Sequence, residues 1–135
     1  MALEIQQRER EGIVILDLTG RITVGPEATL LRDRTSALAA AGTHNMVLNL
    51  GRVDYIDSTG LGALVMVATS QRKLGGAVKL LNLNRRNIQL LVMTKLATVF
   101  EIFNDEQDAV NSYYPDREIK TFDILDFVQK AKEED

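Results

Sequence analysis

The most informative stretch of this chain, residues 53–65, reads VDYIDSTGLGALV. It follows an apolar segment that ends at Leu50, and its second half has the small and apolar residues of a packed helix. We expect a buried strand, a short loop that carries Asp54 and Asp57, and a helix that begins at Ser58. A strand that leads through a short loop into a helix is the repeating unit of α/β folds, so this stretch indicates the fold class.

The segments on either side alternate between strand and helix patterns. Before this stretch, two strands meet at a turn formed by Glu11-Gly12, and a helix begins at Pro26 and ends at Gly42. After it, Gly75-Gly76 ends the central helix and Asn84 can cap the next one. The expected strands cover residues 3–10, 13–18, 45–50, 77–83 and 99–103, and the expected helices cover residues 26–41 and 58–74 and two segments that begin at Asn84 and Asp105.

Strands and helices that alternate in this way predict an α/β single domain. Its sheet should be mixed and mainly parallel, with four to five strands and with helices packed on it. We place this domain at residues 1–114. Residues 115–135 form a C-terminal extension, in which a helix capped by Asp123 carries an apolar stripe. We expect this amphipathic helix to pack on the chain's own core; the alternative is a contact with a second subunit or a partner.

Length and composition exclude several classes of protein. With 135 residues, 45% of them hydrophobic and 26% charged, the chain can form one globular core. No apolar run approaches the roughly 20 residues that span a bilayer, and the N-terminus lacks a signal-peptide pattern. We therefore expect a cytoplasmic protein without membrane insertion. The absence of cysteine excludes disulfides and thiolate chemistry, and a net charge of -3 with scattered basic residues argues against a nucleic-acid partner.

The start of the central helix is the candidate site. Ser58 stands where a hydroxyl can cap the first turn of a helix, and two nearby glycines would leave backbone N–H groups open to another molecule. The side of the helix away from the sheet carries no charge before Arg72, whereas a surface helix normally has charged residues there. We therefore predict a partner-binding surface that consists of Asp54, Asp57, Thr59, Gly60, Gly62, Ala63, Met66 and Val67.

The run Asp57-Ser58-Thr59-Gly60-Leu61-Gly62 after an apolar strand resembles the signature of STAS domains, in particular stand-alone bacterial anti-sigma factor antagonists. The resemblance extends from about Leu3 to Tyr113 and includes Gly20-Arg21-Ile22 after the second strand. It implies a STAS-like fold. It also implies that Ser58 is the residue phosphorylated by an anti-sigma factor that is itself a serine kinase.

This resemblance implies a switch. The unphosphorylated protein would bind the kinase and free a sigma factor, phosphorylation of Ser58 would end the binding, and a phosphatase would reset it. A phosphoserine adds about -1.5 to -2 charges. Beside Asp57, that charge would make a small neutral surface anionic, so that repulsion and desolvation oppose docking. We expect no enzyme activity, cofactor or metal, and the sequence leaves a homodimer open.

Other functions fit the sequence less well. A serine hydrolase needs a base beside Ser58, but the chain's histidine, His44, lies at the far end of the preceding strand, roughly 20 Å away. The pair Gly60-x-Gly62 lacks the further glycine or lysine of nucleotide-binding loops, and two aspartates without more ligands make a poor cation site. The alternative that keeps the fold is a STAS scaffold subunit of a signalling assembly or lipid-transport complex, with no obligatory phosphorylation.

Overall fold

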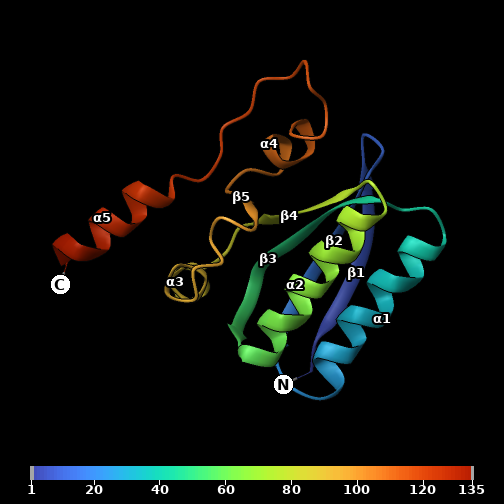
Figure 1. Ribbon diagram of the computed structural model, residues 1–135, viewed down its shortest axis with the longest axis horizontal. Coiled ribbons are helices and arrows are strands. Elements are labelled where there is room, and N and C mark those ends of the chain that lie inside the picture. The colour runs from blue at the N-terminus through green and yellow to red at the C-terminus, as the bar shows by residue number, and fades with distance from the viewer. Residues whose placement is uncertain (1, 135) are drawn as a thin grey trace.

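The structure is a computed structural model that describes residues 2–134, with a five-stranded sheet in the order β1-β2-β3-β4-β5 (Figure 1). The strands are β1 (Glu4–Arg10), β2 (Ile13–Ile22), β3 (Asn45–Ile56), β4 (Ala77–Leu81) and β5 (Glu101–Phe103). The helices are α1 (Pro26–Ala40), α2 (Ser58–Lys73), α3 (Arg85–Met93), α4 (Glu106–Asn111) and α5 (Ile124–Glu134). β1 is antiparallel to β2, and the other neighbouring strands are parallel. This arrangement confirms the predicted α/β fold.

The first three helices pack on one face of the sheet. Each of them connects two neighbouring parallel strands, and right-handed crossovers that advance in one direction place their helices on the same side. Leu48 and Leu80 of the central strands lie in one buried cluster with Leu31 of α1, Leu64 of α2 and Leu91 of α3. α1 and α2 lie side by side across this face (Figure 1). Within residues 2–134, no helix has the length and apolar character needed to cross a membrane.

α4 covers the opposite face of the sheet. Successive side chains along a strand point to opposite faces, so the strands that feed the main core also supply a second cluster. In that cluster, Val47, Leu81 and Phe103 pack with Ala109 and Val110 of α4. Both faces of the central strands are therefore buried, which explains why their sequences are almost continuously apolar.

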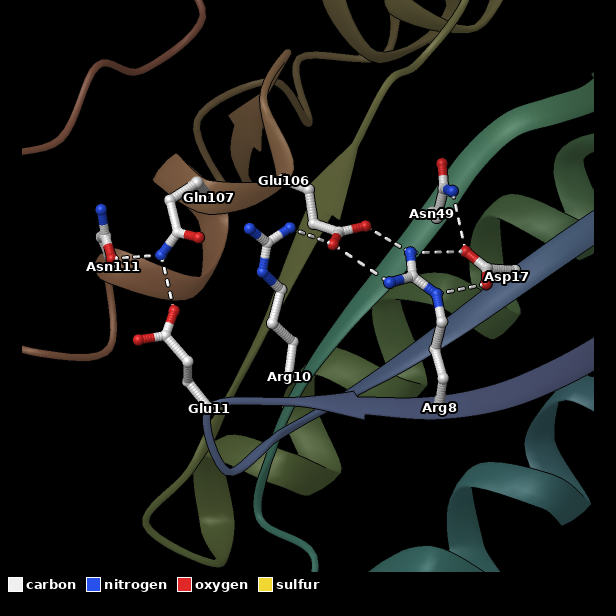
Figure 2. Close-up of polar contacts among 8 residues, drawn as sticks. All are labelled: Arg8, Arg10, Glu11, Asp17, Asn49, Glu106, Gln107 and Asn111. Carbon is white, nitrogen blue, oxygen red and sulfur yellow. Dashed lines mark hydrogen bonds and ion pairs between the residues drawn. The ribbon is translucent and has the colours of Figure 1, made fainter.

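A charged cluster joins α4 to the N-terminal hairpin (Figure 2). Arg8 of β1 donates to both carboxylate oxygens of Asp17, at 2.6 and 3.1 Å, and also binds Glu106 of α4. Arg10 lies 2.6 Å from the Glu106 carboxylate, and Asn49 donates to Asp17 at 2.8 Å. The hydrogen bonds from Arg8 and then Arg10 lower the pKa of Glu106 to about 2. The carboxylate is therefore ionised at neutral pH and holds α4 against the sheet.

Acid should weaken this cluster. The pKa of Glu106 is lower in the folded protein than its ordinary value of 4.5, so its stabilising contribution is complete above that pH and is lost as the pH falls toward 2. Because the group is partly exposed and screened by solvent, we expect a contribution of about 1 kcal/mol. The free energy of unfolding can be measured in urea near pH 7 and at about pH 3. The decrease in this free energy between the two pH values should be smaller in Glu106→Gln than in the unchanged protein, by up to about 1 kcal/mol.

The matched control for this prediction is Glu118→Gln, which removes an exposed carboxylate from the segment before α5. It should leave the pH dependence of the unfolding free energy as it is in the unchanged protein. A Glu106→Gln protein that loses as much stability in acid as the unchanged one would show that the cluster contributes little.

The structure corrects the predicted end of β3. We expected the strand to stop at Leu50 and a loop to follow, but β3 continues to Ile56. The extension pairs with the last residues of β2. On its other edge, where β4 has ended, the side-chain amides of Asn84 and Asn87 donate to the carbonyl oxygen of Val53 at 3.2 and 3.0 Å. The extension contains polar residues, which are typical of a loop. The partners that hold it as a strand come from distant parts of the chain, so the local sequence pattern did not show them.

The C-terminal segment packs against the rest of the chain. The N–H of Phe122 donates to the carbonyl oxygen of Ile102 at 2.9 Å, and Phe122, Ile124 and Phe127 contact the main core. The rings of Phe122 and Phe127 are 5.8 Å apart, and Asp123 caps α5 through a 2.9 Å hydrogen bond. Ile124 and Phe127 of the apolar stripe thus pack on the chain's own core; the domain division after residue 114 stays a prediction.

Candidate partner-binding site

Asp57 anchors the start of α2. As the N-cap residue, it accepts a hydrogen bond at Oδ1 from the N–H of Gly60 at 2.7 Å. Its Oδ2 accepts from the N–H of Val24 at 2.9 Å, in the loop between β2 and α1. These hydrogen bonds, the one from Gly60 first, lower the pKa of Asp57. The ionised carboxylate therefore ties two chain segments together at the carboxyl edge of the parallel strands.

Ser58 is the first residue of α2. We expected Ser58 to cap the helix, but the structure gives that position to Asp57. A carboxylate has two acceptor oxygens that can serve two separate N–H groups, and this site requires both. Ser58 and its neighbour Thr59 are exposed. The hydroxyl of Ser58 is thus presented at the surface by a rigid, capped helix start.

The two glycines of this helix have different environments. A Cβ atom at Gly60 would lie 1.8 Å from the carbonyl oxygen of Ile22, so only glycine allows α2 to approach the end of β2 this closely. A Cβ atom at Gly62 would have no neighbouring heavy atom within 4 Å. Gly62 lies four residues after Ser58, on the same side of the helix. It therefore leaves a small open surface beside the hydroxyl, whereas Gly60 is buried.

Only part of the predicted partner-binding surface is accessible. We expected Gly60, Ala63 and Val67 to contact a partner, but all three are buried in the folded chain. Gly60 is buried against Ile22 of β2, and α1 lies beside α2 on the side that carries Val67, so these uncharged residues serve the chain's own packing. Asp57 is partly buried. The exposed members of the predicted surface, together with the candidate phosphorylation site, are Asp54, Ser58, Thr59, Gly62 and Met66.

A groove beside Ser58 could not be seen in the sequence. It has a volume of about 320 Å³ and lies between the start of α2 and α3. Tyr55, Arg86 and Met93 line it together with Ser58. Met93 is 81% exposed, and the guanidinium carbon of Arg86 lies 4.3 Å from the centre of the Tyr55 ring. The residues that line this groove come from β3, α2 and α3, which are separate segments of the sequence, so no local pattern indicated it.

The fold and this site agree with a known family. Residues 4–109 match the STAS domain. The chain belongs to the STAS domain family. Over 102 residues, this STAS protein is 33% identical to the anti-sigma-B factor antagonist of Bacillus subtilis (strain 168), an alignment that covers 76% of this chain and 92% of that protein.

Two solved structures share the fold of this STAS protein. An anti-sigma factor antagonist from Mycobacterium paratuberculosis matches with a TM-score of 0.71 and 18% identity, over 82% of this chain and 93% of that one. The Bacillus cell fate determinant SpoIIAA in the phosphorylated form matches with a TM-score of 0.64 and 17% identity, over 82% of this chain and 99% of that one. These likenesses confirm the predicted STAS fold.

Proposed function

We propose that this STAS protein is an anti-sigma factor antagonist that phosphorylation of Ser58 switches off. Without phosphate, it binds an anti-sigma factor that is a serine kinase and so releases a sigma factor in the cytoplasm; a phosphatase restores binding. The main support is the position of Ser58, an exposed hydroxyl at the first residue of a helix that Asp57 caps. The similarity to an anti-sigma-B factor antagonist supports the same role.

Phosphorylation would change the charge of this surface with little change in fold. The γ-phosphoryl group of ATP would pass to the Ser58 oxygen, ADP would leave, and a base of the kinase would take up the hydroxyl proton. The product carries about -1.5 to -2 charges next to the ionised Asp57. A partner that docks around Ser58 would then meet a hydrated anion, so repulsion and desolvation would oppose the contact. In this scheme the protein is a substrate and a ligand, not an enzyme.

A phosphotransfer assay tests the proposal. The full chain, incubated with ATP and a serine-kinase anti-sigma factor encoded near its gene, should gain one phosphate by mass spectrometry. Ser58→Ala should gain none. Thr59→Ala, which removes the adjacent exposed hydroxyl, should still gain one. Phosphate on the Ser58→Ala protein, or no transfer by any co-encoded kinase of this type, would contradict the proposal.

Met66 should be the apolar anchor of the docking surface. It is 52% exposed on α2, two turns after Ser58. Met66→Glu places a charge in the middle of the proposed contact, so we expect the affinity for the kinase to fall about tenfold to a hundredfold. The free energy of unfolding should change by less than about 0.5 kcal/mol, because the side chain is on the surface. Titration calorimetry and urea unfolding measure the two quantities.

Leu74→Glu is the matched control for Met66→Glu. Leu74 is apolar, 46% exposed and lies at the other end of α2, so a glutamate there adds the same charge outside the proposed contact. Its affinity for the kinase should remain unchanged. If Met66→Glu binds as tightly as Leu74→Glu, the exposed face of α2 is not the docking surface.

The scaffold alternative has less support. A STAS subunit of a signalling assembly or a lipid-transport complex would use the same fold without obligatory phosphorylation. The relatives that match most of this chain are antagonists of anti-sigma factors, and Ser58 is exposed as a substrate hydroxyl must be. The antagonist function therefore fits better.

A further inference from the structure

The position of Arg86 is not explained by the stability of its own helix. Arg86 lies in the first turn of α3 together with Arg85, and that turn contains no acidic residue. Positive charge at a helix N-terminus opposes the helix dipole, so it is unfavourable there. The guanidinium of Arg86 stacks on the ring of Tyr55. Within the part of the chain that the structure describes, it has no carboxylate partner. A cation is thus held over the groove that contains Ser58.

The N-terminus of α2 has little capacity for an added anion. Free N–H groups and the dipole at a helix N-terminus ordinarily favour a phosphate. In the structure, the carboxylate of Asp57 already occupies this position and accepts the N–H of Gly60 at 2.7 Å. A phosphate in the same place would compete with that carboxylate and repel it. The phosphate therefore needs a counter-charge from another direction.

We propose that Arg86 binds the phosphate on Ser58 within the same molecule, an inference that rests on the proposed phosphorylation of this serine. Ser58 and Arg86 line the same groove of about 320 Å³. The second oxygen of Asp57 points to Val24, in the loop before α1, so it does not hold the guanidinium. Arginine suits this task because its guanidinium donates two parallel N–H groups to phosphate oxygens, and its long side chain needs to move only from the Tyr55 ring.

This ion pair would change the shape of the binding surface as well as its charge. In the unphosphorylated protein, Arg86 lies against Tyr55 and the groove beside Ser58 is open. In the phosphorylated protein, the guanidinium and the phosphate would both occupy the groove. A partner that inserts a side chain there would be excluded by volume as well as by repulsion.

The titration of the phosphate tests the ion pair. Phosphoserine can be incorporated at position 58 of the full chain during translation, so the experiment requires no kinase. A bound guanidinium lowers the second pKa of the phosphate from its usual value of about 6. In ³¹P NMR titrations, Arg86→Gln should therefore raise that pKa by about half a unit or more. Arg85→Gln removes the same charge from a neighbour that lines a different groove, and it should change the pKa by less than about 0.2 units.

Two results would overturn the ion pair. One is an equal phosphate pKa in the unchanged protein and in Arg86→Gln. The other is an equal rise in Arg86→Gln and Arg85→Gln, which would indicate only the general field of α3. A failed phosphotransfer assay would count against the proposed function and not against this ion pair, because the phosphoserine is supplied directly.

Discussion

Gly60→Ala should lower the free energy of unfolding by about 3 kcal/mol. The added Cβ atom would lie 1.8 Å from the carbonyl oxygen of Ile22. That oxygen also accepts the N–H of Asp57 at 3.2 Å, so moving it would disturb the residue that caps α2. Moving α2 instead would loosen the packing of Leu61 and Leu64, which are buried against the sheet. Neither adjustment is small, which is why we expect a large effect from one methyl group.

Gly62→Ala is the control for this prediction. A Cβ atom at Gly62 would meet no heavy atom within 4 Å, and alanine in place of glycine inside a helix stabilises it by up to about 1 kcal/mol. Urea unfolding of the two variants should therefore show shifts of opposite sign. If Gly60→Ala is as stable as Gly62→Ala, α2 does not approach the end of β2 as closely as the structure indicates.

Ser58→Asp should weaken binding to the kinase by about a hundredfold or more, whereas Ser58→Ala should bind as the unchanged protein does. The aspartate places a second carboxylate next to Asp57, and like charges brought together at an interface cost several kcal/mol. The alanine removes only a small exposed hydroxyl. Titration calorimetry without ATP measures both affinities, because no phosphate can then be transferred during the experiment.

Gln129→Asp serves as the charge control for this pair of variants. Gln129 is exposed on α5, so the same charge is added to the protein outside the proposed docking surface on α2. Its affinity should be close to that of the unchanged protein. Equal affinities of Ser58→Asp and Ser58→Ala would reject the switch, and a loss of affinity in Ser58→Ala would show that the hydroxyl itself is a contact.

Elements with a local cause could be predicted from the sequence. The hairpin turn forms at Glu11-Gly12, where both residues have positive φ, 52° and 86°. α1 begins at Pro26, and α2 ends before Gly75, which has a φ of 82°. Asn84 caps α3 by accepting the N–H of Asn87 at 2.8 Å. In each case the residues that determine the conformation are neighbours in the sequence, so their pattern was sufficient.

Elements with distant partners were predicted less well. The second half of β3 was expected to be a loop. The residues that hold it as a strand come from β2 and from the start of α3, and the local sequence does not show these partners. Ala63 and Val67 were expected to face a partner, because the sequence does not show that α1 lies beside α2. The cap of α2 was assigned to Ser58 because the second acceptor contact of Asp57, to Val24, joins residues far apart in the chain.

The sequence by itself determined the order of strands and helices, the α/β class and the serine at the start of α2, since each depends on apolar periodicity and on residues adjacent in the chain. Only the tertiary structure decided which side of α2 is accessible, which residue caps it and which cation shares the groove with Ser58. These properties arise where β2, α1 and α3 converge on one helix end, and a contact between segments that lie 20 or more residues apart leaves no local pattern.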